Sequence, residues 1–124
     1  MKEKRPVYLN LLQIKFPCPA IVSILHRISG VILFLLLPLL LCLLSQSLRS
    51  ADTFNGLHET FSHPLLRFFV WVVLSSLLYH LIAGIRHLLM DAGIGESLEG
   101  GRWGSYIVLA LSIISILLLG IWLW

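Results

Sequence analysis

The chain has 124 residues, of which 58% are hydrophobic and only 12% are charged, with a formal net charge of +3. Soluble domains carry roughly 25% charged residues, so this composition cannot cover the surface of a small soluble fold and excludes a soluble enzyme with its own core. The two cysteines, Cys18 and Cys42, are too few for a four-thiolate zinc or iron–sulfur site.

We expect the N-terminal segment, residues 1–20, to lie along the membrane surface. Aliphatic and polar residues are mixed over residues 7–15, as in amphipathic interfacial segments. The turn Pro17-Cys18-Pro19 then separates this segment from the first apolar run. A cleaved signal peptide is disfavoured, because that run begins late and is longer than a signal core.

Three stretches lack Asp, Glu, Lys and Arg, namely residues 28–48, 68–85 and 103–124. Each is close to the ~20 residues that a helix needs to cross the hydrocarbon core, and the short alternating strands of a membrane barrel are missing from the sequence. We therefore predict one all-α membrane domain over residues 1–124, with transmembrane helices at about 22–48, 65–90 and 103–124. Pro38 is expected to kink the first helix without ending it.

The connections between these helices, residues 50–64 and 92–101, are too short for a further domain. The first connection contains His58 and His63. Two loop histidines make an incomplete metal site, so we expect a surface role for both.

Basic residues set the predicted orientation. Five of them precede the first helix, namely Lys2, Lys4, Arg5, Lys15 and Arg27, while Arg49 and Arg67 flank the first connection and Arg86 and Arg102 flank the second. The positive-inside rule then places the N-terminus in the cytoplasm and the C-terminus, with Trp122 and Trp124, at the periplasmic interface. Because these charges flank apolar runs, they favour membrane orientation over nucleic-acid binding.

The second predicted helix has a small and polar face, formed by Ser76, His80, Gly84, His87 and Asp91. Their spacings of three or four residues place them on one side of the helix. His80 precedes Arg86 by six residues, so it lies ~9 Å deeper in the membrane.

A histidine at that depth needs a partner, and three interpretations are open. It is a structural histidine bonded to a neighbouring helix, a proton-relay group together with His87 and Asp91, or an axial ligand to haem iron. The small residues Ala83 and Gly84 would leave room for a porphyrin, although a glycine also suits close helix packing.

The start of the first helix carries a second polar cluster, which contains Ser23, His26, Arg27, Ser29 and Gly30. Arg27 could simply mark the membrane boundary. A serine hydroxyl one turn from a guanidinium can also bind the carbonyl oxygen of a lipid-soluble ligand and stabilise negative charge during its reduction. Arg27 and His26 could equally face acidic propionates.

The two clusters together resemble a known family, the cytochrome b subunit of succinate dehydrogenase, which is the larger membrane-anchor chain of respiratory complex II. The resemblance covers nearly the whole chain. It is carried by Arg5-Pro6, by Ser23-Ile24-Leu25-His26-Arg27-Ile28-Ser29-Gly30 and by the motif that runs from His80 through Gly84, Arg86 and His87 to Asp91.

The resemblance implies roles for individual residues. His80 matches the axial ligand to haem b, with the second ligand supplied by a smaller hydrophobic anchor subunit. Ser23 and Arg27 match residues that line the ubiquinone pocket. Four residues, His26, Arg27, Arg86 and His87, are expected on the side of the haem propionates. Because the helix topology puts both polar clusters on the cytoplasmic side, Ser23, Arg27 and Arg86 are expected to gather around one site above His80.

The resemblance also implies partners and a location. The chain would pack with the smaller anchor subunit into a helical bundle, hold an iron–sulfur subunit and a succinate-oxidising flavoprotein, and lie in lipid in the bacterial inner membrane. On its own it would not be an enzyme. The alternative from a different class is an anchor that holds peripheral subunits without binding haem.

Overall fold

The computed structural model describes residue 10 and residues 13–124, and these form four helices and no strand. The helices are α1 (Cys18–Ser47), α2 (Ala51–Phe61), α3 (Pro64–Asp91) and α4 (Leu98–Leu123). Three of them, α1, α3 and α4, are long and apolar enough to cross a membrane. The predicted all-α class with three spans is therefore confirmed. Lys2, Lys4, Arg5 and most of the predicted interfacial segment lie outside the described residues.

Helix α1 begins at Cys18, a few residues before the predicted start, so the N-terminal segment is shorter than expected. Pro17 is the N-cap residue and Pro19 lies in the first turn, where a missing amide proton costs nothing because the first amides of a helix have no partner within it. Pro38 lies inside the helix, which continues to Ser47. The prediction that the span continues through Pro38 is thus confirmed.

Helix α2 was not predicted and occupies most of the connection between the first two spans. Ser50 and Thr53 form a capping box, in which the Ser50 hydroxyl accepts from the Thr53 amide at 3.1 Å. Asp52 in the first turn adds a favourable interaction with the helix dipole. At the next boundary, His63 Nδ1 accepts from the Leu65 amide at 3.4 Å and caps α3.

A tight turn connects α3 to α4. Gly93 and Gly95 adopt φ values of +83° and +78°, which glycine tolerates without a steric penalty. The Gly93 and Ile94 amides donate to the carbonyls of Met90 and Leu89, the pattern of a Schellman motif. Because Ser97 then caps α4 by accepting from the Gly100 amide, this helix begins at Leu98, five residues before the predicted start.

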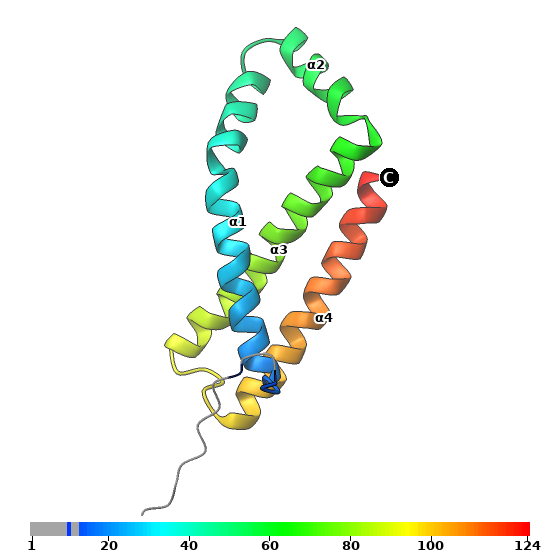
Figure 1. The fold of residues 1–124 in the computed structure, drawn as a ribbon. Coiled ribbons are helices and arrows are strands. Elements are labelled where there is room, and N and C mark those ends of the chain that lie inside the picture. The colour runs from blue at the N-terminus through cyan, green and yellow to red at the C-terminus, as the bar shows by residue number, and fades with distance from the viewer. Residues whose placement is uncertain (1–9, 11–12) are drawn as a thin grey trace, which may run out of the picture.

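The three long helices meet at one end of the molecule (Figure 1). Helices α1 and α3 diverge toward α2, which bridges their far ends, while α4 runs alongside α3. One side chain from each long helix forms the buried apolar cluster, namely Val22, Ala83 and Val108. Large apolar side chains elsewhere, such as Phe34 and Ile121, remain exposed on the outside, as expected for surfaces that face lipid or another subunit.

One polar contact joins the far halves of α3 and α4. The Trp71 indole donates to the Ile116 carbonyl at 3.1 Å, and a Cβ atom on Gly120 would lie 3.2 Å from that indole nitrogen. We predict that Trp71→Phe destabilises the fold by about 0.6 kcal/mol, the mean value for interhelical hydrogen bonds in membranes. Thermal unfolding in detergent measures the effect. Trp122→Phe is the matched control, because Trp122 is 77% exposed, and an equal change in both variants would contradict the prediction.

Candidate functional site

His80 projects from the middle of α3 toward α1. It lies eleven residues before Asp91, the last residue of α3, which corresponds to about 16 Å along the helix axis. Its Nδ1 atom is 3.0 Å from the Ser29 hydroxyl and 3.2 Å from the His26 carbonyl oxygen. The imidazole is therefore held by the backbone and a side chain of a single turn of α1.

Two further imidazoles surround this contact. The rings of His26 and His80 are stacked, with centroids 4.2 Å apart and an interplanar angle of 12°. The rings of His26 and His87 meet edge to face at 4.9 Å. His26 thus lies between the two histidines of α3, and we refer to His26, His80 and His87 as the imidazole cluster.

Glycines allow α1 and α3 to approach each other at the imidazole cluster. A Cβ atom on Gly30 would lie 3.0 Å from His80 Cε1, and one on Gly84 would lie 3.3 Å from His26 Nε2. Both positions contact the ring on the opposite helix, so any larger residue would press on an imidazole. Gly84 was expected either to leave room for a porphyrin or to allow close helix packing. Its contact with His26 within this chain is of the second kind.

Ser23 and Arg27 lie on α1 close to His26 in the sequence, three residues before it and directly after it. Ser23 is half-buried and Arg27 is exposed, whereas the buried residues of this helix are Val22 and Ser29. Arg27 is one of the charged groups within electrostatic range of His87, together with Arg86 and Asp91. The Arg27 guanidinium therefore borders the cluster where another molecule can reach it, and the half-buried Ser23 lies about one helical turn before it on α1.

Arg86, which was expected to gather with Ser23 and Arg27 around one site, is bonded to α4 in this chain. Its guanidinium donates to the Gly101 carbonyl of α4 at 3.0 Å, and a Cβ atom on Gly104 would lie 3.2 Å from its Nε. The reason is geometric: consecutive helical residues differ by about 100°, so Arg86 faces α4 while His87 faces α1. The buried Nε has no hydrogen-bond partner among the described residues.

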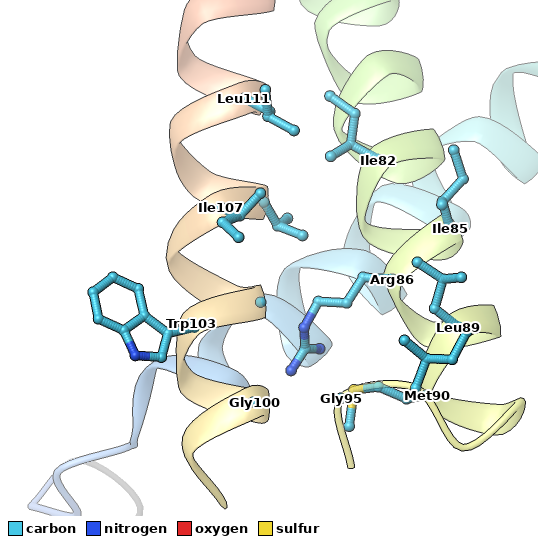
Figure 2. Close-up of a pocket in the computed structure, with 13 residues that line it drawn as sticks. Ile82, Ile85, Arg86, Leu89, Met90, Gly95, Gly100, Trp103, Ile107 and Leu111 are labelled. Carbon is cyan, nitrogen blue, oxygen red and sulfur yellow. The ribbon is translucent and has the colours of Figure 1, made fainter. Parts of the chain in front are cut away.

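A cavity of about 460 Å³ lies between α3 and α4, on the side of Arg86. Figure 2 shows the Arg86 side chain between the two helices, with Ile82, Ile107 and Leu111 farther along the cavity. Its walls are almost entirely apolar apart from this guanidinium. The cavity is thus separated from the imidazole cluster by α3 itself.

Ser29 was seen in the sequence only as one member of a polar cluster, and no role was predicted for it. In the structure it is 5% exposed, and its hydroxyl contacts both the His26 carbonyl, at 2.8 Å, and His80. Tyr79, next to His80, was also missed, and its hydroxyl donates to the Val22 carbonyl at 2.8 Å. A serine three residues after a histidine, at the start of an apolar run, was the available signal for Ser29.

Comparisons with known proteins agree with a membrane-spanning chain. The family model for the succinate dehydrogenase/fumarate reductase transmembrane subunit matches residues 1–119. The succinate dehydrogenase cytochrome b556 subunit of Coxiella burnetii is 48% identical over 125 residues, which covers 100% of both chains. The cytochrome b560 subunit of the same enzyme from Porphyra purpurea is 34% identical over 110 residues, covering 86% of this chain and 87% of the relative. The cytochrome b556 subunit from Paracoccus denitrificans is 31% identical over 114 residues, with 89% and 85% covered.

Proposed function

The chain belongs to the succinate dehydrogenase/fumarate reductase transmembrane subunit family, and from this premise we propose that it is the cytochrome b anchor of a succinate:ubiquinone oxidoreductase. In this role it binds haem b jointly with a smaller hydrophobic anchor subunit. It also contributes to the ubiquinone-reduction site and holds the iron–sulfur and flavoprotein subunits at the membrane. The relatives' names, which specify a cytochrome b subunit of succinate dehydrogenase, support the proposal.

The observation that carries the proposal is the position of His80. Within the described part of the chain, both hydrogen bonds of its ring involve Nδ1, which leaves Nε2 as the nitrogen that can bind a metal. A porphyrin supplies four equatorial nitrogens, so iron within it needs only axial ligands from protein, and neutral imidazole is a common one. His80 would therefore hold the iron of haem b through Nε2, and the bound haem would supply a one-electron redox centre.

The residues around His80 suit the acidic edge of a porphyrin. His26 and His87 contact each other beside His80, and Arg27 lies within electrostatic range of His87. We assign these three residues to the propionate side, where cations and ring N–H groups form charge-assisted hydrogen bonds to carboxylates. Arg86 was assigned to the same side from the sequence. In this chain it is bonded to α4, so a propionate contact would require its side chain to turn.

Ser23 and Arg27 form the ubiquinone-binding part of the proposal. Reduction of a quinone adds two electrons and two protons, and negative charge develops on its carbonyl oxygens before the protons arrive. A guanidinium stabilises that charge and donates hydrogen bonds in a fixed fork geometry. The exposure of Arg27 and the partial exposure of Ser23 leave both groups accessible to a quinone that enters from the membrane.

The proposal includes an orientation, which rests on the positive-inside rule. With the N-terminus in the cytoplasm and the C-terminus in the periplasm of a bacterial inner membrane, the start of α1 and the end of α3 face the cytoplasm. Electrons from succinate oxidation would reach this side through the iron–sulfur subunit. Exposed apolar residues on the long helices leave ample surface for the smaller anchor subunit and for lipid.

A haem-free membrane anchor is the second candidate function, and one observation favours it. Ser29 and His26 already form hydrogen bonds with His80 Nδ1 within the chain. These contacts give the half-buried imidazole a structural role that needs no haem. In that case α1 and α3 would be joined by this contact and the peripheral subunits would still be held at the membrane.

Purification of the native complex separates the two functions. We predict that the chain copurifies with a second hydrophobic subunit, an iron–sulfur protein and a flavoprotein, and that the complex shows a haem b difference spectrum on reduction with dithionite. Subunits are identified by mass spectrometry and haem is quantified by pyridine haemochrome. A complex with all four subunits and no haem would leave the haem-free anchor as the function.

A further inference from the structure

Resting on the function proposed above, we propose that Ser29 is a positioning residue for His80. Its hydroxyl accepts a hydrogen bond from the Nδ1–H group, which together with the His26 carbonyl fixes the tautomer of the imidazole and leaves Nε2 as the nitrogen that would bind the haem iron. Ser29 lies within the stretch that carries the family resemblance, but the sequence by itself assigns it no role. The inference starts from the three polar atoms that meet at this point of the α1–α3 interface.

The neighbours of the Ser29 hydroxyl determine whether it donates to His80 Nδ1 or accepts from it. The Ser29 hydroxyl is 2.8 Å from the His26 carbonyl oxygen, which can only accept, so the hydroxyl proton points to that carbonyl. The Ser29 oxygen then presents lone pairs to His80 Nδ1, 3.0 Å away. Nδ1 also lies 3.2 Å from the same carbonyl. Two acceptors therefore face Nδ1, and a proton on Nδ1 satisfies both.

The opposite tautomer would be disfavoured at this site. An unprotonated Nδ1 would place its lone pair 3.2 Å from the His26 carbonyl oxygen, where two acceptors repel each other. Ser29 is only 5% exposed, so water cannot readily compensate, and an unsatisfied buried acceptor costs more than an exposed one. Protonation of Nδ1 follows, and the neutral ring then carries its lone pair on Nε2.

The same turn of α1 also fixes the orientation of the ring. His80 Cε1 lies against Gly30, where a Cβ atom would be 3.0 Å away, and the ring of His26 stacks on its face at 4.2 Å. An imidazole held at Nδ1, at one edge and on one face has little rotational freedom. Its Nε2 is therefore presented in one direction before any ligand arrives, which is the usual function of outer-shell groups around metal-binding histidines.

Hydrogen bonding at Nδ1 also has an electronic consequence. An acceptor on this N–H raises the basicity of the ligating nitrogen, and a more basic ligand favours ferric over ferrous iron. The Ser29 hydroxyl should thus lower the midpoint potential of the haem. A serine that only filled space between two helices would not have this effect.

The test uses the whole purified complex and three variants. In Ser29→Ala, Nδ1 keeps the His26 carbonyl but loses the hydroxyl, so we expect haem to be retained with a higher midpoint potential and altered EPR g-values of the low-spin ferric haem. Ser29→Thr keeps a hydroxyl and should restore the original potential. Ser112→Ala is the matched control, because Ser112 is 3% exposed on α4 and its hydroxyl has no partner among the described residues.

Each outcome decides the inference. A raised potential in Ser29→Ala, restored in Ser29→Thr and absent from Ser112→Ala, supports it. An unchanged potential and unchanged g-values in Ser29→Ala overturn it, as does a threonine variant that behaves like the alanine variant. His80→Ala separates failure of the proposed haem ligation from failure of the role of Ser29. If that variant keeps its haem spectrum, His80 is not the ligand and Ser29 cannot position one. If His80→Ala loses the spectrum while Ser29→Ala is unaffected, the inference alone is wrong.

Discussion

Replacement of His80 with alanine is expected to abolish the low-spin haem b signal of the assembled complex. The methyl group of alanine cannot coordinate iron, and the ring nitrogen that the site presents disappears with the imidazole. Haem would be lost or would lack this ligand, and both results would remove the original reduced-minus-oxidised spectrum. Optical difference spectroscopy on the purified variant, normalised to the flavoprotein content, measures the effect.

The control for His80→Ala is His58→Ala, since His58 is an exposed residue of α2. We expect this variant to keep the full haem signal. His87→Ala is informative because His87 belongs to the same imidazole cluster but is assigned to the propionate side, so it should perturb the spectrum without removing the axial ligand. An unaltered spectrum in His80→Ala would exclude this residue as the iron ligand.

Replacement of Arg27 with alanine is expected to slow quinone reduction while succinate oxidation with an artificial acceptor is largely retained. The guanidinium contributes a charged hydrogen bond, for which losses of about 1.5–3 kcal/mol are typical, and this corresponds to about 10- to 100-fold in rate. The artificial acceptor takes electrons before they reach the quinone, so its reduction does not depend on Arg27. The ratio of the two activities in membranes is the measurement.

Two further variants separate the chemistry of Arg27 from its charge at the membrane boundary. Arg102→Ala removes an exposed guanidinium from the first turns of α4 and should leave the ratio of activities unchanged. Arg27→Lys keeps a positive charge but loses the fork of donors, so an intermediate ratio is expected. Equal quinone kinetics in wild type and Arg27→Ala would remove Arg27 from the quinone site.

The sequence predicted the spans better than the connections between them. An apolar run of ~20 residues has few alternatives to a transmembrane helix, because unpaired backbone groups are too costly in lipid. The starts of α1 and α4 were less accurate, because both helices begin before their charge-free segments, α1 at Cys18 and α4 at Leu98 after the Ser97 cap. Helix α2 was missed although the Ser50 and Thr53 capping box is visible in the sequence.

The polar face of α3 was also predictable in part. Spacings of three and four residues correctly placed His80, Gly84 and His87 on one side of the helix, and all three contact α1. The spacing could not indicate which atoms of α1 lie opposite. His26 stacks on His80, and Ser29 is the hydrogen-bond partner of its Nδ1. Both contacts depend on where α1 and α3 cross, which the sequence does not give.

Arg86 and His87 are neighbours in the sequence but contact different helices. The amino-acid order alone determined that both lie near the end of a membrane-spanning helix, because hydropathy and helical periodicity act along a single segment. Only the tertiary structure decided that Arg86 bonds α4 and His87 meets α1. The physical reason is that periodicity fixes the direction of a side chain around its own axis, whereas the neighbour in that direction depends on how separate helices pack.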